Sequence, residues 1–282
     1  VGQVEPVFCN IRDDQLVRDA LQGADAVVNC VATFDVGGKN SFDAVQLKGA
    51  ERIARIAAEL NLEKMVHLSG LGADEEGQSA YAQTKAAGEA AILAHMPDAM
   101  ILRPSVIFGT EDQFFNRFAG MSKFGPILPI AGAGSRFQPV YVDDVAKAAV
   151  CGILGQAPGG IYELGGPDVA SLGDLMHRML AVIQRRRLVL NLPFFAARLM
   201  ALGFDRAQTL SLGLFHNGIL TRDQVKQLAE DNVVSETAKG FADLGIEPTP
   251  MASVLPDYLW RYRPSGQYAE IKASAGNLRA DN

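Results

Sequence analysis

The chain has 282 residues, of which 48% are hydrophobic and 21% are charged, and its formal net charge is −6. This composition excludes a mainly disordered, coiled-coil or collagen-like protein, and the acidic balance argues against a general nucleic-acid binder. The three cysteines, Cys9, Cys30 and Cys151, lie far apart in the sequence, which favours a reducing compartment over a disulfide framework. No apolar run reaches the roughly 18 residues of a membrane span.

The first part of the chain alternates between short apolar runs and longer segments of helical period. The apolar runs predict strands at 4–9, 26–31, 65–68 and 99–102. Helices are predicted at 15–22, 41–60 and 80–94. Such alternation is typical of βαβ units on a doubly wound parallel sheet, with helices on both faces. We therefore predict an α/β fold.

The composition and period change after about residue 164. Beyond this point the pattern is mostly helical, which predicts a second and smaller region. We expect a dinucleotide-binding domain over 1–164 and a substrate- or partner-docking region over 165–282. In a doubly wound sheet, ligands bind beyond the carboxyl ends of the strands, so the residues that follow each strand are the candidates for a site.

One such position carries a hydroxyl group, at Ser69, and the next predicted helix carries Tyr81 and Lys85. The last two residues are four apart, so they share one face of the helix. A lysine beside a phenol lowers its pKa, which suits a tyrosine that acts as a general acid. A Tyr–Lys pair alone occurs by chance on many helices, but Ser69 at a strand end strengthens the catalytic interpretation.

This Ser–Tyr–Lys constellation resembles the site of the short-chain dehydrogenase/reductase superfamily, in its extended or atypical branch. The resemblance covers nearly the whole chain, and RFQPVYVDDVAKA at 136–148 is similar to that branch's signature near the substrate cleft. It implies a Rossmann-like fold, with Ser69, Tyr81 and Lys85 as catalytic residues and no metal site. The implied contacts of a bound NADP(H), less plausibly NAD(H), are Asn10, Ile11, Cys30, Val31, Ala32, Tyr81, Lys85, Pro104, Ser105 and Val106. Many relatives have Asp where this chain has Asn10.

Three further strings resemble one family within that superfamily. They are GTEDQFFNRFA at 109–119, LTRDQVKQLAEDNVVSE at 220–236 and DLGIEPTPMASVLPDYLWRYR at 243–263. They look like the dehydrogenase-like accessory subunit of respiratory complex I, the alpha-subcomplex subunit nine family. This resemblance implies a tightly held NADP(H), other complex I subunits as partners, and a structural or regulatory role near the quinone junction.

The beginning of the sequence departs from the superfamily pattern. Relatives open with a strand and a Gly-rich turn whose backbone N–H groups hold the pyrophosphate. Gly37-Gly38 and Gly159-Gly160 lack the required strand before and helix after, so we expect the first βαβ unit to be missing. A sheet without its central strand would expose two apolar edges, which favours a sequence that starts downstream of the protein's true start over a degenerate protein.

Residues 176–206 contain six Arg and a single acidic residue, a local charge of +5 in an acidic chain. An apolar, aromatic segment follows Arg185, Arg186 and Arg187, and includes Phe194 and Phe195. A basic cluster beside such a segment predicts peripheral contact with an anionic membrane or with a partner. The alternative is a core helix of the smaller domain with Arg on its exposed face.

Two functions remain open. The first is an NADP(H)-holding, non-catalytic accessory subunit of complex I. It would be peripheral on the cytoplasmic face of a bacterial inner membrane or on the matrix side of the mitochondrial inner membrane. The second is a free-standing NADP(H)-dependent reductase or epimerase that uses Tyr81 as its acid/base.

Overall fold

The computed structural model describes residues 3–33, 37–210 and 221–266. The chain divides into two compact units, the first made of residues 1–105, 143–165 and 234–247, and the second of the remaining residues. The boundary expected near Leu164 falls beside one of the points where the chain passes between units. Residues 106–142, however, belong to the second unit, and residues 234–247 belong to the first.

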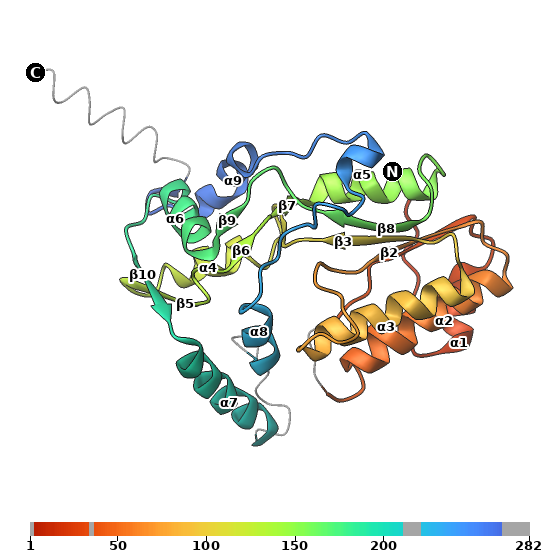
Figure 1. The fold of residues 1–282 in the computed structure, drawn as a ribbon, viewed down its shortest axis with the longest axis horizontal. Coiled ribbons are helices and arrows are strands. Elements are labelled where there is room, and N and C mark those ends of the chain that lie inside the picture. Colours follow the sequence, from red (N-terminus) through yellow and green to blue (C-terminus); the bar gives the residue numbers. More distant parts are fainter. Residues whose placement is uncertain (1–2, 34–36, 211–220, 267–282) are drawn as a thin grey trace, which may run out of the picture. The chain divides into compact units, whose positions relative to one another are not determined.

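The first unit is built on a parallel sheet of four described strands in the order β1–β2–β3–β8 (Figure 1). The strands are β1 (Ala26–Asn29), β2 (Lys64–Leu68), β3 (Met100–Pro104) and β8 (Gly160–Leu164). The central strands are apolar on both faces, as expected of a sheet that is covered on both sides. The predicted α/β fold is confirmed, and three of the four predicted strands lie within a few residues of their expected bounds.

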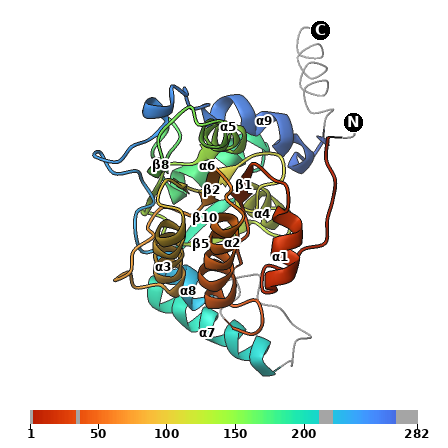
Figure 2. The same cartoon turned by 90° about the vertical axis from the view of Figure 1, so that its right-hand side faces the viewer.

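Helices cover both faces of this sheet. Helices α1 (Asp14–Leu21), α2 (Lys48–Glu59) and α3 (Ala80–His95) lie side by side (Figure 2), and their apolar residues form one buried cluster with Met65 and Ile101. Helix α5 (Val142–Ile153) lies on the opposite face (Figure 1), where Gly152 faces Val66 and Met100. Neighbouring strand residues therefore point to opposite helical layers.

The strand predicted at 4–9 is wrong. No strand is assigned to these residues, and their apolar side chains are exposed, with Val4 87% and Phe8 84% accessible. An extended apolar segment becomes a strand only by hydrogen bonding to a neighbour, and no described strand pairs with it. The local pattern was suitable for a strand, but the tertiary pairing is absent.

The predicted helix at 41–60 consists of two parts. A π-helical segment, η1 (Asp43–Leu47), precedes α2. Helix α3 packs closely on this segment, because a Cβ added at Gly88 would lie 2.2 Å from the backbone oxygen of Gln46. Any residue larger than glycine at position 88 would push the two elements apart.

The second unit combines short strands with helices. Its core gathers Phe108, Phe115, Leu128, Leu175 and Tyr258 among other buried residues. The described elements of this unit are β4 (Ile107–Phe108), α4 (Phe115–Met121), β5 (Ile127–Ala131), β6 (Arg136–Phe137), β7 (Val140–Tyr141), β9 (Ala170–Ser171), α6 (Leu172–Val182), β10 (Leu188–Leu192), α7 (Phe194–Leu210), α8 (Arg222–Gln227) and α9 (Met251–Leu259). Short 3₁₀ turns, η2 (Phe241–Leu244) and η3 (Trp260–Tyr262), complete the two units.

The segment after Arg187 is a strand followed by a helix. Strand β10 pairs in parallel with β5, with Leu188 opposite Ile127. Helix α7 follows directly after Pro193, whose carbonyl accepts hydrogen bonds from the N–H groups of Ala196 and Ala197. Over the described part of the chain, no helix combines the length and apolar character needed to cross a membrane.

Candidate functional site

A pocket of about 430 Å³ in the first unit brings together the cofactor contacts predicted after two strands. Asn10 and Ile11 line it from the segment before α1, and Val31 and Ala32 line it from the segment after β1. These pairs are twenty residues apart in sequence, from Ile11 to Val31. The fold thus gathers four of the residues that the family resemblance implied as cofactor contacts.

Hydrogen bonds hold side chains at and beside this pocket. Gln46, 1% exposed, donates through Nε2 to the carbonyl oxygen of Thr33 (2.9 Å) and accepts at Oε1 from the hydroxyl of Thr84 (3.0 Å). The carboxamide oxygen of Asn10 accepts from the backbone N–H and the Nε of Arg12 (3.1 and 3.2 Å). An adenine contact from Asn10 would therefore use its NH₂ group as the donor.

Tyr81 and Lys85 lie on one face of α3, as predicted. The Lys85 Nζ is 5.9 Å from the centroid of the Tyr81 ring and donates to the carbonyl oxygen of Leu68 at 3.0 Å. Burial lowers the pKa of Lys85 to about 8, an effect that the nearby Glu89 opposes. Burial also raises the pKa of Tyr81 to about 12. The expectation that Lys85 lowers the phenol's pKa is therefore wrong, because desolvation of the phenolate outweighs the neighbouring charge.

Ser69 belongs to a buried polar network. Its hydroxyl donates to Oε1 of Glu89, which is 3% exposed. Arg103 donates to both carboxylate oxygens of Glu89 at 2.6 to 3.1 Å and lies 3.9 Å from Glu163. A carboxylate held in this way is costly to disturb, since loss of one partner leaves the other charge buried. The Ser69 hydroxyl is thus bound to a structural carboxylate in this conformation.

The position beside the Tyr81 hydroxyl is occupied by Gly70. A Cβ added at residue 70 would lie 3.0 Å from the phenol oxygen. A side-chain hydroxyl at position 70 would therefore reach Tyr81, whereas glycine offers none. The site therefore has Tyr81 and Lys85 on one helix face, as expected. At residue 70, where a side-chain hydroxyl could face the phenol, it has a glycine.

The remaining predicted contacts fall at different places. Cys30 lies near Lys85, whose charge lowers the pKa of the thiol while burial, the larger effect, raises it. Pro104 ends β3, and the N–H of Ser105 donates to the carbonyl oxygen of Leu164 (2.9 Å). Val106 belongs to the second unit, where it lines a different, apolar pocket. The predicted contact segment 104–106 therefore spans the boundary between the two units.

A polar pair at the carboxyl ends of β1 and β2 was missed by the sequence analysis. Asn29 and His67 are register partners, and the Asn29 Nδ2 lies 3.0 Å from the His67 Nδ1. His67 is 1% exposed, its Nε2 has no hydrogen-bond partner, and burial lowers its pKa to about 3. The ring is therefore neutral, with Nδ1 as the acceptor. The sequence does not reveal this pair, because which residues lie opposite each other depends on the register between β1 and β2.

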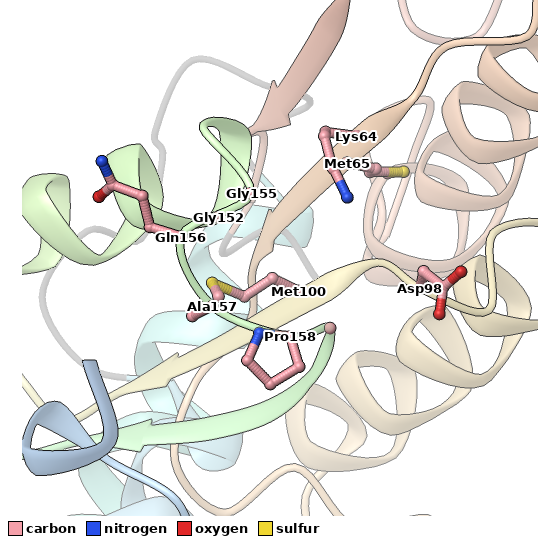
Figure 3. Close-up of a pocket in the computed structure, with 10 residues that line it drawn as sticks. Lys64, Met65, Asp98, Met100, Gly152, Gly155, Gln156, Ala157 and Pro158 are labelled. Atoms are coloured by element: carbon pink, nitrogen blue, oxygen red, sulfur yellow. The ribbon is translucent and has the colours of Figure 1, made fainter.

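A further pocket, of about 380 Å³, lies at the opposite, amino ends of the strands. Lys64 starts β2, Met100 starts β3, and Asp98 precedes it (Figure 3). Figure 3 shows Lys64 projecting toward the loop that carries Gly155. Ligands of doubly wound sheets bind at the other edge. Within the described ranges, no group of three or more metal-ligating side chains gathers anywhere.

The sequence analysis also missed Arg12, which lines the first pocket beside Asn10 and Ile11. Its position directly after that pair was the available signal. Arg117, whose basic side chain could bind an anionic group but was expected to be solvated, lines the apolar pocket of the second unit. Its partial burial could not be inferred from a short helix of mixed composition.

A parallel sheet with helices on both faces, a pocket beyond the carboxyl end of β1 and a Tyr–Lys pair on α3 define a Rossmann-type protein of the short-chain dehydrogenase class. The sequence pattern of the NAD dependent epimerase/dehydratase family matches residues 2–165. The structure of Bordetella bronchiseptica WbmH in complex with NAD+ is similar in fold, with a TM-score of 0.62 at 16% identity, covering 94% of this chain and 85% of that one.

The similarity to two mitochondrial proteins is greater in sequence. NADH dehydrogenase (ubiquinone) 1 alpha subcomplex subunit 9 of Arabidopsis thaliana is 33% identical over 94% of this chain and 67% of its own length. The NADH-ubiquinone oxidoreductase 40 kDa subunit of Neurospora crassa is 28% identical over 100% of this chain and 72% of its own. The chain belongs to the NAD dependent epimerase/dehydratase family and, within it, to the family of the alpha subcomplex subunit 9 proteins. Both relatives carry mitochondrial names, so the bacterial location considered above has no support from them.

Proposed function

We propose that the protein is an accessory subunit of mitochondrial NADH:ubiquinone oxidoreductase that holds NADP(H) without turning it over. The observation that carries this proposal is the similarity of almost the whole chain to subunits of that complex. The site supports a non-catalytic role. Ser69 is bound to Glu89, Gly70 faces the phenol, and the pKa of Tyr81 is raised to about 12. A phenol with so high a pKa is a poor acid/base near neutral pH.

The pocket at Asn10 suits the adenosine end of a dinucleotide. It offers apolar side chains, Ile11 and Val31, to a flat base, and an amide donor at Asn10. Arg12 lines the same pocket, and an arginine near the ribose is how such folds accommodate the 2′-phosphate of NADP. Tyr81, Lys85, Pro104 and Ser105 would contact the remainder of the cofactor. When bound, the cofactor supplies hydride chemistry, whereas these residues bind and orient it.

The test is assembly in the organelle. Cells that lack the endogenous subunit receive the tagged chain, and native gels with NADH-oxidation staining show whether it migrates with the complex. Extraction of the purified complex with acid and with base then measures NADP⁺ and NADPH. The proposal predicts comigration and about one nucleotide per chain. Tyr81→Phe should leave both unchanged, because only a hydroxyl is lost. A chain that folds but never joins the complex would overturn the proposal.

The second candidate is a free-standing NADP(H)-dependent reductase or epimerase. It is favoured by the geometry of Tyr81 and Lys85, since their shared helix face is the arrangement that acid/base chemistry requires. In this case Tyr81→Phe should lower turnover by about 10²-fold or more, the usual scale for removal of a general acid. The two candidates therefore predict different outcomes for one substitution.

The proposed attachment to the complex or membrane uses an exposed apolar face of the second unit. We define the outer apolar face as the exposed residues Phe124, Ile127, Leu188, Leu190, Phe195 and Leu199. Figure 1 shows α7, which carries the last two, continuing from β10. Arg186 and Arg198 are also exposed on these segments. Such a combination of apolar and basic residues suits peripheral contact on the matrix side of the inner membrane.

Not all of the residues expected in this contact are available. Phe194 packs inward on a cluster with Ala197 and Val225. Arg185 and Arg187 donate through Nε to the carbonyl oxygens of Tyr262 and Ser122, both at 2.7 Å. Phe195, 75% exposed, is available, as is Arg186. The proposed contact therefore rests on the outer apolar face with Arg186 and Arg198, rather than on the arginine triplet as a whole.

A further inference from the structure

Basic residues gather in the second unit where the carboxyl ends of α4, α6 and η3 come together. Helices α4, α6 and α9 pack against one another (Figure 1), and η3 continues directly from α9. The segments 118–125, 179–190 and 258–263, which contain these ends, include six lysines and arginines and no acidic residue. We call these six residues the basic patch: Lys123, Arg185, Arg186, Arg187, Arg261 and Arg263.

Tyr262 joins the three segments. The Nζ of Lys123 is 4.6 Å from the centroid of the Tyr262 ring, and the guanidinium carbon of Arg261 is 6.0 Å from it. Arg185 donates through Nε to the carbonyl oxygen of Tyr262 at 2.7 Å. Cations from three separate parts of the sequence are therefore held around one residue.

The positive charge of the patch is balanced only in part. Arg185, Arg187 and Arg263 donate to backbone carbonyl oxygens near the helix ends, and a whole helix carboxyl end carries only about −0.5 of a charge. Within the part of the chain that the structure describes, Lys123, Arg186 and Arg261 form no ion pair with a carboxylate. These three residues are also exposed, so they are accessible to an anion.

An exposed apolar side chain adjoins the patch in each of the three segments. Phe124 is 91% exposed, Leu188 is 62% exposed and Trp260 is 39% exposed, and each is next in sequence to a residue of the patch. Tryptophan and other large apolar residues beside lysine and arginine are typical of protein surfaces that lie at the boundary between lipid head groups and acyl chains. A free anion, or an acidic segment of a protein, would use the charges but would leave the apolar side chains without an apolar partner.

We propose that Lys123, Arg186 and Arg261 bind the phosphate head group of an anionic phospholipid, while the adjoining apolar side chains enter the acyl-chain boundary. Guanidinium groups form bidentate hydrogen bonds with phosphate oxygens, and the lysine adds a compact positive charge. This inference rests on the peripheral membrane contact proposed above. It adds the class of lipid that is recognised and assigns roles to Lys123, Arg261 and Trp260.

The test uses the fluorescence of Trp260, which is the single tryptophan of the chain and lies beside Arg261. The full 282-residue chain is mixed with vesicles of phosphatidylcholine, either alone or with phosphatidylglycerol. We expect the emission of Trp260 to move to shorter wavelength with the mixed vesicles, and brominated acyl chains to quench it. Sedimentation of the same samples measures total binding.

A double variant tests the head-group contact. Lys123→Gln with Arg186→Gln should weaken binding to the mixed vesicles roughly 30-fold, about fivefold for each cation near an anionic surface, and should leave binding to phosphatidylcholine alone unchanged. Lys239→Gln is the matched control, because Lys239 is an exposed lysine 5.5 Å from a tyrosine ring centroid in the first unit. The control should change neither measurement.

The inference is overturned if the mixed vesicles leave the emission of Trp260 unchanged, or if they bind the double variant as they bind the parent chain. The fluorescence measurement uses the parent chain, so it decides the matter even if the variant folds poorly. A chain that sediments with vesicles, or migrates with the complex, without a change at Trp260 would retain the proposed attachment and lose only this head-group site. A chain that does neither would contradict the proposed function itself.

Discussion

The hydroxyl of Tyr81 lies directly against the backbone of Gly70, so that a Cβ at position 70 would be 3.0 Å from the phenol oxygen. Real Cβ atoms rarely approach a neighbour so closely. The phenol oxygen fits at this place because residue 70 is a glycine, and the Nζ of Lys85 lies 5.9 Å from the centroid of the same ring. The candidate site is built as a packed arrangement around Tyr81.

This relationship predicts a coupled effect on stability. Gly70→Ala should lower the free energy of unfolding by about 1–3 kcal/mol, because the added methyl group overpacks the contact with the Tyr81 hydroxyl. In a Tyr81→Phe background that oxygen is absent, so the same alanine should cost much less. Urea unfolding of the four proteins in this double-mutant cycle measures the coupling.

Gly134→Ala provides the control for the glycine substitution. A Cβ at position 134 meets nothing within 4 Å, so the control should change stability only slightly. If the two effects at Gly70 and Tyr81 are additive, the close contact between them is not present in solution.

A second prediction concerns Ser69. Because its hydroxyl donates to the buried Glu89 carboxylate, Ser69→Ala should lower the free energy of unfolding by about 1.5–3 kcal/mol, the range for a hydrogen bond to a charged group. The loss should be smaller in a Glu89→Gln background. If Ser69 served only to hold a substrate, the Ser69→Ala protein would keep the stability of the parent protein and would lose only turnover. Chemical denaturation distinguishes these outcomes.

The buried histidine predicts a dependence of stability on acid pH. The pKa of His67 is about 3 in the folded protein and near 6.5 when unfolded, so the unfolded chain binds a proton first as the pH falls. The stability contributed by His67 is therefore complete above pH 6.5 and is lost on acidification, by up to about 1.4 kcal/mol per pH unit. His67→Gln, which keeps an acceptor for Asn29, should flatten this slope between pH 6.5 and 4.5.

The exposed His177 offers the matched control for that measurement. His177→Gln should retain the pH dependence of the parent protein. Urea unfolding at several pH values gives the slopes directly. An unchanged slope in the His67 variant would mean that other groups cause the acid sensitivity.

The sequence was informative wherever periodicity and position relative to a strand end decided the structure. The strands 26–31, 65–68 and 99–102 and the helices 15–22 and 80–94 follow from apolar period alone, since these elements bury the same faces in the fold. Asn10 and Val31 do line one pocket, as the family resemblance implied, although the strand expected before Asn10 is not formed.

The features that could not be predicted depend on tertiary contacts. Residues 4–9 have the composition of a strand but lack a pairing partner among the described strands. The pKa of Tyr81 depends on how deeply the ring is buried. The spacing of four residues between Tyr81 and Lys85 indicates only that the two side chains are neighbours. The partner of Ser69 is Glu89, twenty residues away, and nothing local in the sequence indicates that bond.

The last prediction tests the outer apolar face. The double change Phe195→Ser with Leu199→Ser should release the protein from the membrane or complex. These two side chains are 75% and 70% exposed in the free protein. Their burial in an apolar environment on attachment would contribute a few kcal/mol together, and serine would remove that contribution. Arg186→Gln with Arg198→Gln should weaken the association by about 2 kcal/mol, roughly 1 kcal/mol for each arginine near an anionic surface, and mainly at low salt. Sedimentation with phosphatidylcholine vesicles, with and without phosphatidylglycerol, measures both effects.

The controls for this prediction separate attachment from folding. Val150→Ser with Leu154→Ser removes two exposed apolar side chains of the first unit and should leave binding unchanged. Arg185→Gln with Arg187→Gln removes donors to the carbonyl oxygens of Tyr262 and Ser122, so it should lower the melting temperature, whereas the Arg186 and Arg198 changes should not. If the Phe195 and Leu199 changes leave binding intact, or lower the melting temperature as much as the Arg185 and Arg187 changes do, the outer apolar face is part of the fold and does not form the attachment surface.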